Sequence, residues 1–339
     1  MKLSVLLTYR YANVWVIVVT FLLSGCSYQG LSREQIDKEP PLPMSVDLDG
    51  TPFFPQERYQ CGPAALATVL NESGIDTNPE ELTPYVYLPG RKGSLRVDIV
   101  ATARRFKRLP YELEGSLTAV FTELASGRPV LVMQNLGFSW FPQWHYAVII
   151  GYDLNQNTVT LRSGKERRHV IPIYTFDKTW ERAGRWALIT AKPDQIPITA
   201  EATSYARVVH DIGKLYPDVA ISAYQKAVNQ WQHEPLLWLA LGNMFYQQKE
   251  FQKSVNMFSE GLAYHPYNVQ LWNNYAYGLS AQGCQAASLA AINCAVQIKP
   301  RNLDLKQSLL ELRETKVSAL QHCEVLSCPE INTANQTDS

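Results

Sequence analysis

Hydrophobic and polar residues follow three different patterns along the chain, and each pattern covers its own region. An uninterrupted apolar run occupies residues 14–23. Apolar runs typical of buried strands occupy residues 128–134 and 145–152, and a turn at residues 153–157 leads from the second run into a hairpin partner. From about residue 204 onward, apolar side chains recur at helical spacing. These patterns predict an N-terminal apolar segment, an α+β domain and an all-α domain.

The N-terminal segment has the features of a signal peptide. Lys2 and Arg10 supply positive charge ahead of the apolar run, which is about half of the roughly 20 residues that a membrane-spanning helix needs. The segment ends in Leu-Ser-Gly-Cys26, which resembles a bacterial lipobox, where the cysteine thiol carries lipid and the chain is cut before it. Ser27 then implies an outer-membrane lipoprotein that faces the periplasm of a Gram-negative bacterium. A plain secretory peptide and an inner-membrane helix are the alternatives.

A cysteine stands at the predicted start of a helix. Residues 56–74 read QERYQCGPAALATVLNESG, in which Pro63 favours the first turn of a helix and Gly74 ends the apolar periodicity. Cys61 therefore lies where unpaired backbone N–H groups and the positive end of the helix dipole stabilise a thiolate. This position suits a nucleophile, and a buried small hydrophobe is the alternative.

A histidine opens the second strand pattern, at His145. A helix that carries a cysteine, followed by further helices and then by a strand that opens with histidine, is the chain order of papain-like peptidases. In such an enzyme the imidazole takes the proton of the thiol as a base and later gives it to the leaving amine.

The segments CGPAALATVL and HYAVIIGYD, with GRPVLV between them, resemble the bacteriocin-processing, double-glycine cysteine peptidase family over roughly residues 52–165. The resemblance implies a papain-like α+β fold with Cys61 as the nucleophile and His145 as the general base. It also implies an oxyanion-hole glutamine about six residues before the nucleophile, a position that Gln56 approaches most closely. The acid that the family usually has about 16 residues after the histidine is missing from the local sequence TLRSG.

The missing acid leaves the partner of the histidine open. Asp153 lies roughly 26 Å from His145 along the same strand, at about 3.3 Å per residue, and is too far away. In the predicted hairpin, the residues opposite His145 fall between 162 and 165. Ser163 is the candidate to hold the imidazole, because Arg162 cannot accept a hydrogen bond. A neutral partner stabilises an imidazolium less than a carboxylate does, so a working Cys–His pair and a site that has lost catalysis both remain open.

Aromatic residues stand just before the histidine. Trp140 and Trp144 are candidates for the wall of a substrate-binding groove, and packing of this loop onto the core is the alternative. Tyr85, Tyr87 and Arg91, in the loop after the first helices, are further candidates for the cleft. The sequence predicts no metal site and no cofactor.

A period of 34 residues runs through the C-terminal region. Residues of matching type that are offset by 34 are Trp238 and Trp272, Phe258 and Ile292, and Pro266 and Pro300. This period is the signature of the tetratricopeptide repeat (TPR), a helix pair that buries its apolar face by stacking on its neighbours. The groove of such a solenoid binds peptides or partner proteins, and bracing of the peptidase domain is the alternative. Asn243, Tyr246 and Asn274 are candidates for the groove.

The six cysteines divide by role rather than into three bridges. Cys26 is assigned to lipid and Cys61 to catalysis. The four that remain are candidates for disulfides, which the periplasm permits: Cys284, Cys294, Cys323 and Cys328. Three pairings are possible, and Cys284–Cys294 with Cys323–Cys328 closes the shortest loops. None of the spacings suits a tetrahedral zinc site.

Composition excludes one class of partner. The chain of 339 residues carries 31 basic and 31 acidic side chains, so it lacks the basic excess that is typical of nucleic-acid binders. The predicted organisation runs in five parts, which are a signal peptide at 1–25, a tether at 26–50, a papain-like peptidase domain at 51–197, tetratricopeptide repeats at 204–320 and a tail at 321–339.

The predicted function is that of a lipid-anchored periplasmic cysteine peptidase. It cleaves a peptide or protein substrate, recruits a protein partner through its repeats, is attached to the membrane through lipid on Cys26, and binds no nucleic acid. The alternatives are a catalytically degenerate peptide-binding scaffold and a cell-wall amidase.

Overall fold

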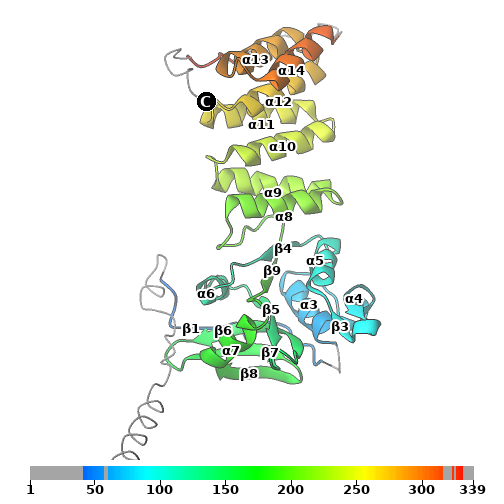
Figure 1. Cartoon of the computed structure of the whole chain (residues 1–339), viewed down its shortest axis with the longest axis vertical. Helices are drawn as coiled ribbons and strands as arrows, with labels where there is room; N and C mark the ends of the chain where they lie inside the picture. The colour runs from blue at the N-terminus through cyan, green and yellow to red at the C-terminus, as the bar shows by residue number, and fades with distance from the viewer. Residues whose placement is uncertain (1–40, 57–59, 316–322, 324–325, 331–339) are drawn as a thin grey trace, which may run out of the picture.

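Figure 1 shows the computed structural model, which describes residues 41–56, 60–315, 323 and 326–330. A part built of sheet and helices forms one end of the molecule, and a stack of helix pairs extends from it. Cys26 and the predicted signal peptide lie outside the described residues. Within the described residues, no helix is both long enough and apolar enough to cross a membrane.

One antiparallel sheet organises the N-terminal part. Its strand order is β4-β9-β5-β6-β7-β8. β1 pairs with residues 151–153 of β6, past the first residue of β5. The strands of this sheet are β1 (Ser45–Asp47), β4 (Leu109–Glu112), β5 (Val130–Asn135), β6 (Trp144–Asp153), β7 (Thr158–Ser163), β8 (Glu166–Pro172) and β9 (Ala187–Ala191). A separate two-stranded ribbon consists of β2 (Tyr87–Leu88) and β3 (Gly93–Ser94).

Helices cover both faces of the sheet. They are α3 (Cys61–Glu72), α4 (Pro79–Val86), α5 (Arg96–Arg105), α6 (Leu117–Ala125) and α7 (Ile173–Glu181). Successive side chains of a strand point to opposite faces, so neighbours on β5 enter different clusters. Leu131 packs in one cluster with Leu66 of α3, and Val132 lies in the other cluster with Phe121 of α6 and Trp180 of α7. The sheet with its two helical layers is an α+β fold, as the sequence predicts.

The sheet begins earlier in the chain than the sequence indicates. β1 lies within residues 26–50, which are expected to form a tether. The guanidinium of Arg168 on β8 fixes the segment after β1 through ion pairs of 2.8 Å to Asp47 and to Asp49. This short polar segment forms a strand because it pairs with β6, and no local pattern of apolar residues predicts such pairing.

The segment that joins the two parts is held in place by a buried carboxylate. Glu123 of α6 is fully buried, and it accepts hydrogen bonds from the backbone N–H and the hydroxyl of Thr199 at 2.8 and 2.6 Å. Arg128 supplies the countercharge at 3.0 Å. Across the junction, Arg104 of α5 pairs with Asp211 at 3.0 Å. These contacts, together with an apolar cluster that is continuous across the junction, hold the first repeat helix against the sheet part.

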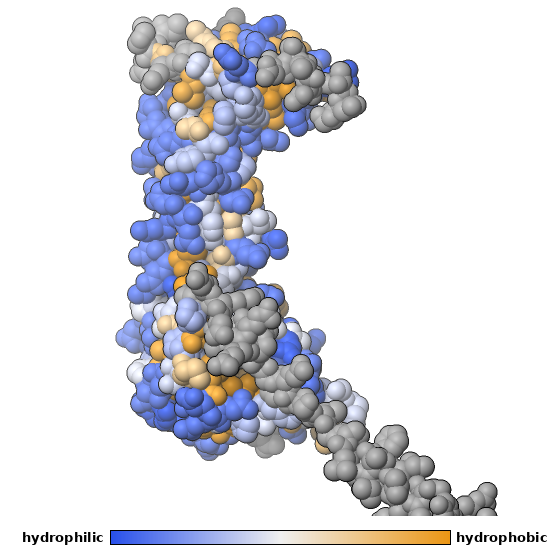
Figure 2. Space-filling view, turned by 90° about the vertical axis from the view of Figure 1, so that its left-hand side faces the viewer, coloured by the Kyte–Doolittle hydropathy of each residue, from blue (hydrophilic) through white to orange (hydrophobic). Residues whose placement is uncertain are grey.

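The C-terminal part is a helical repeat solenoid. Its helices are α8 (Ala202–Gly213), α9 (Pro217–Gln230), α10 (Pro235–Gln247), α11 (Phe251–Tyr264), α12 (Val269–Ala281), α13 (Gln285–Ile298) and α14 (Leu303–Glu314). Trp238 and Trp272, which are 34 residues apart, are buried at equivalent places in α10 and α12. Gly242 allows α11 to approach closely, since a Cβ atom there would lie 2.3 Å from the ring of Phe258. The stack bends, and Figure 2 shows the hollow that results on one side of the molecule.

Two disulfides attach the C-terminal segment to the last repeat. They join Cys284 to Cys323 and Cys294 to Cys328, so the pairing is not the one that closes the shortest loops. Cys284 caps α13 and Cys294 lies inside this helix, which places the two cysteines about 15 Å apart at about 1.5 Å per residue. A disulfide needs Cα atoms only about 4.4–6.8 Å apart, so each of the two must pair outside the helix.

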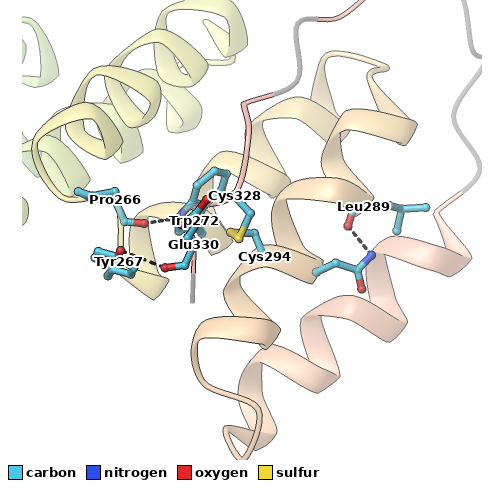
Figure 3. The surroundings of a disulfide bond; sticks show 8 residues. Pro266, Tyr267, Trp272, Leu289, Cys294, Cys328 and Glu330 are labelled. Carbon is cyan, nitrogen blue, oxygen red and sulfur yellow. Dashed lines mark hydrogen bonds between the residues drawn. A yellow bond between two sulfur atoms is a disulfide. The ribbon is translucent and has the colours of Figure 1, made fainter. Parts of the chain in front are cut away.

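Figure 3 shows the surroundings of the second disulfide. The hydroxyl of Tyr267 donates a hydrogen bond of 3.2 Å to the carbonyl oxygen of Glu330, and the indole N–H of Trp272 donates one of 2.7 Å to the carbonyl oxygen of Pro266. Residues 326–330 therefore lie against the repeat helices rather than extending away from them.

Candidate active site

Cys61 is the first residue of α3, as the sequence predicts. It is half-buried and is the free cysteine among the described residues. The ribbon strand β3 crosses the start of α3 so closely that a Cβ atom on Gly62 would lie 2.2 Å from the Ser94 hydroxyl oxygen. Glycine after the cysteine is therefore required for this approach. The contact fixes the ribbon beside the thiol.

His145 lies near the start of β6, opposite Gln134 of β5 in the register of the sheet. Its Nε2 atom is 2.8 Å from the hydroxyl oxygen of Ser163, which is the last residue of β7. The pairing of β6 with β7 shifts between Ile149 and Gly151, and this irregularity contributes to the register that brings Ser163 to the imidazole. The hydrogen bond occupies one ring nitrogen and leaves Nδ1 for the cleft.

Gln56 reaches the same cleft from the loop after β1. Its backbone N–H donates a hydrogen bond of 2.9 Å to the carbonyl oxygen of Gly164, and its side-chain Nε2 lies 3.5 Å from the carbonyl oxygen of Tyr146. The first bond ties Gln56 to the β7–β8 turn, next to Ser163. The second, at the long limit for a hydrogen bond, is weak enough for the amide to turn toward a ligand.

These residues surround a cleft of about 980 Å³. Gln56, Cys61 and His145 line it, so three segments that are far apart in the sequence meet in one cavity. Trp144 lines it as well, in agreement with its candidacy for substrate contact. Trp140 is not among its described lining residues; its side chain is 82% exposed and stacks on Phe138.

Burial sets the charge state of Cys61 and His145. It raises the pKa of the Cys61 thiol, and the backbone N–H groups of Tyr146, Gly62 and Cys61 offset only part of that rise. Burial also lowers the pKa of His145 to about 4, and the positive charge of His169 adds to this effect. The helix terminus alone predicts a thiolate. In the folded protein, both groups are neutral at pH 7.

Arg162, which is next to the expected sequence position of the missing acid, is buried. Arg162 is 2% exposed and donates hydrogen bonds of 2.8 and 2.6 Å to the carbonyl oxygens of Thr51 and Asp49. It therefore holds the loop that leads to Gln56, and it does not contact His145. Ser163 provides the polar partner of the imidazole instead.

Several lining residues of the cleft have no clear signal in the sequence. They are Lys92, Gly93, Ser94, Leu95, Gln143, Tyr146, Gly164 and Lys165. Arg91, a weak candidate from its place after the first helices, also lines the cleft, whereas Tyr85 and Tyr87 are not among its described lining residues. The ribbon residues enter through the contact at Gly62, which can be recognised only after β3 is placed. In the described part of the chain, no cluster of three or more histidine, cysteine or acidic side chains suits a metal ion.

An α+β domain with a cysteine at a helix start and a histidine at a strand start, both facing one cleft, defines a cysteine-peptidase-like class of protein. Residues 48–188 match the model of the Peptidase_C39 like family. This part of the chain is thus a C39-like peptidase domain, and it is fused to TPR-like repeats.

Other proteins resemble parts of the chain. The peroxisomal targeting signal receptor of Saccharomyces cerevisiae is 28% identical over 116 residues, which cover 33% of this chain and 19% of that protein. The chain thus spans about a fifth of the length of the curated relatives that it matches.

Two solved structures also resemble parts of the fold. A C39-like peptidase from Bacillus anthracis has 18% identity and a TM-score of 0.38, over 44% of this chain and 98% of that one. The TPR domain of Arabidopsis OM64 has 15% identity and a TM-score of 0.30, over 33% of this chain and 92% of that one.

Proposed function

We propose that the protein is a cysteine peptidase that hydrolyses a peptide or protein substrate at Cys61. The observation that carries this proposal is the shared cleft, in which the thiol, the imidazole of His145 and the side chain of Gln56 meet inside a C39-like domain. The three groups match the parts that thiol-based acyl transfer needs, which are a nucleophile, a base and a hydrogen-bond donor for the oxyanion.

The proposed reaction begins from a neutral pair. His145 Nδ1 accepts the thiol proton of Cys61 while the sulfur attacks the scissile carbonyl carbon, and the side-chain amide of Gln56 donates a hydrogen bond to the oxyanion. The imidazolium then gives its proton to the leaving amine, and a thioester forms. Water, deprotonated by His145, hydrolyses the thioester, and the proton returns to the thiol. The hydroxyl oxygen of Ser163 accepts a hydrogen bond from Nε2–H throughout and thereby keeps Nδ1 available as a base.

We propose further that the repeats bind a protein partner. A groove of about 730 Å³ runs across α8, α10 and α12, and it is lined by Asn243 and Asn274, whose side-chain amides are joined by a hydrogen bond of 2.9 Å. Tyr246, the third residue expected in the groove, is not among its described lining residues; its ring packs on Phe251. Amide side chains beside an apolar floor suit an extended peptide segment.

The proposed location is the periplasmic face of the outer membrane, with lipid on Cys26 as the anchor. Support comes from the lipobox-like sequence and from the two disulfides of the last repeat, because disulfides form and persist in oxidising compartments. Growth with a labelled fatty acid tests this proposal. We expect label in the wild-type protein and none in a Cys26→Ala variant.

Comparison of wild type with Cys61→Ala tests the catalytic proposal. Both proteins, without signal peptide, are incubated with a peptide library prepared from periplasmic proteins, and new termini are identified by mass spectrometry. We expect new termini with the wild type alone. The same pair of proteins is treated with a thiol-reactive probe, and labelling at this domain is expected only in the wild type.

A catalytically inactive binding scaffold is the second candidate. The observations that favour it are the neutral hydroxyl of Ser163, instead of an acid, beside the imidazole and the burial that keeps both proposed catalytic groups neutral. Absence of new termini, together with binding of peptides to both proteins, would support the scaffold.

A further inference from the structure

The cleft around Cys61 is lined by basic side chains from two separate elements. Arg91 ends the short turn Pro89–Arg91, and Lys92 follows it with a left-handed backbone, φ 48°. Both belong to the ribbon that packs against the start of α3. Lys165 comes from the turn between β7 and β8, on the side of Ser163 and Gln56. Three cationic side chains thus line the cleft from two different parts of the fold.

No carboxylate balances these charges within the described lining of the cleft. Arg91 and Lys165 are exposed, and neither makes a hydrogen bond or an ion pair with another described residue. The carboxylate nearest in sequence, that of Glu166, is 2.8 Å from Nδ1 of His169. This carboxylate is therefore directed to His169 rather than to Lys165.

Several basic side chains elsewhere in the same domain have carboxylate partners. Arg168 lies between Asp47 and Asp49, Lys178 is 2.9 Å from Glu181, and Arg128 is 3.0 Å from buried Glu123. Arg91 and Lys165 differ from these side chains, because neither has a carboxylate partner among the described residues. The catalytic groups add no negative charge, because the Cys61 thiol and the imidazole are both neutral at pH 7.

We propose that the cleft selects peptides with acidic side chains within a few residues of the scissile bond. This inference rests on the proposed peptidase function and names the substrate class of the same site. The long stems of Arg91, Lys92 and Lys165 reach carboxylates at different distances from the cut, so an extended acidic segment suits the arrangement better than a single small anion does. The positive field also attracts such a segment before it docks.

The first experiment uses three synthetic peptides that share one sequence and differ at the positions flanking the cut, which carry Glu, Gln or Lys. The parent sequence is taken from a cleavage identified in the library. We expect kcat/KM to fall about tenfold from Glu to Gln and further from Gln to Lys, because each lost or reversed contact with a partly exposed cation changes binding by a few-fold. The preference should weaken as salt screens the charges.

Charge reversal at one rim of the cleft sharpens this test. Lys165→Glu should lower kcat/KM for the Glu peptide about tenfold and raise it for the Lys peptide. Lys226→Glu makes the same change of charge on an exposed position of α9, far from the cleft, and should leave the order of the three peptides unchanged. Equal cleavage of all three peptides by the wild type, or an equal effect of both substitutions, overturns the inference and leaves the peptidase function standing.

Binding separates the inference from catalysis. Fluorescein-labelled peptides with six consecutive Glu or six consecutive Gln residues are titrated into the Cys61→Ala protein and into its Arg91→Gln/Lys165→Gln derivative. We expect at least about fivefold tighter binding of the Glu peptide, and loss of that preference in the derivative. If the library shows no cleavage at all, the peptidase function fails, and this titration still decides the charge preference. Equal affinities for the two peptides would refute it.

Discussion

The peptidase cleft and the repeat groove are both concave binding regions, but they are built in different ways. Residues from the loop after β1, the start of α3, the β2–β3 ribbon, the start of β6 and the β7–β8 turn meet in the cleft. The groove is made by α8, α10 and α12, which present equivalent faces at regular intervals. The cleft therefore depends on the register of one sheet, whereas the groove depends on the stacking of similar units.

The two regions also differ in what stabilises them. The sheet part has a core on both faces of its strands, and its buried carboxylate, Glu123, is paired with Arg128. The last repeat is followed by a single helix, α14, among the described residues, and two disulfides attach the C-terminal segment to it. An end unit of a solenoid lacks one neighbour, so covalent attachment of the C-terminal segment compensates for the missing contact.

The largest expected effect separates the chemistry of the cleft from the binding of the groove. His145→Ala should lower kcat/KM by about 10³-fold, because the base that accepts the thiol proton is removed. Binding of a partner to the repeats should not change. His233→Ala, on the exposed surface of the repeats, is the matched control and should leave kcat/KM as in the wild type. A similar loss in both variants would contradict the assignment of His145.

The next effect concerns the closure of the last repeat. Cys294→Ser/Cys328→Ser removes a bridge with a sequence separation of 34, and the unfolding free energy of the repeat part should fall by about 3 kcal/mol. Urea unfolding followed by tryptophan fluorescence measures this, and Trp272 lies beside the bridge. Peptidase activity without urea should be unchanged. Loss of activity at zero urea would show that the two parts are more strongly coupled than the comparison implies.

A smaller effect tests close packing within the stack. Gly242→Ala places a methyl group 2.3 Å from the Phe258 ring, and we expect a loss of about 1–3 kcal/mol in the stability of the repeats. Gly50→Ala is the control, since no atom lies within 4 Å of its added methyl group. Thermal unfolding of the two variants, compared with the wild type, measures the difference. Equal unfolding midpoints of the two variants would show that α11 moves away from the added methyl group at little cost in free energy.

The smallest effect concerns the neutral partner of the histidine. Ser163→Ala should lower kcat/KM about five- to tenfold, because one hydrogen bond that orients the imidazole is lost. Ser163→Asp places a negative charge beside Nε2 and should raise the pKa of His145 from about 4.

The pH profile measures this rise. A protonated imidazole cannot accept the thiol proton, so wild-type activity should be lost as the pH falls through about 4. In Ser163→Asp the loss should begin at a higher pH. If the acid side of the pH profile falls at the same pH in both proteins, Ser163 does not face Nε2 of His145 as proposed.

Local patterns were sufficient for the elements that carry the main site residues. The apolar spacing after Cys61 predicts α3, and the continuous apolar run after His145 predicts β6, because burial of one face is recorded in the sequence itself. The 34-residue offset of Trp238 and Trp272 predicts the repeat stack for the same reason. These helices and strands can be predicted without knowing which distant residues they contact.

Pairing between distant residues was decided by the tertiary structure. Counting along the hairpin leaves four residues opposite His145, and the irregular pairing of β6 with β7 is what places Ser163 at its ring. The length of α13 separates Cys284 from Cys294 and thereby excludes the shortest disulfide loops. The basic rim of the cleft exists only because the ribbon crosses the start of α3. Burial, too, is a property of the assembled fold, and it converts a position that favours a thiolate into one that holds a neutral thiol.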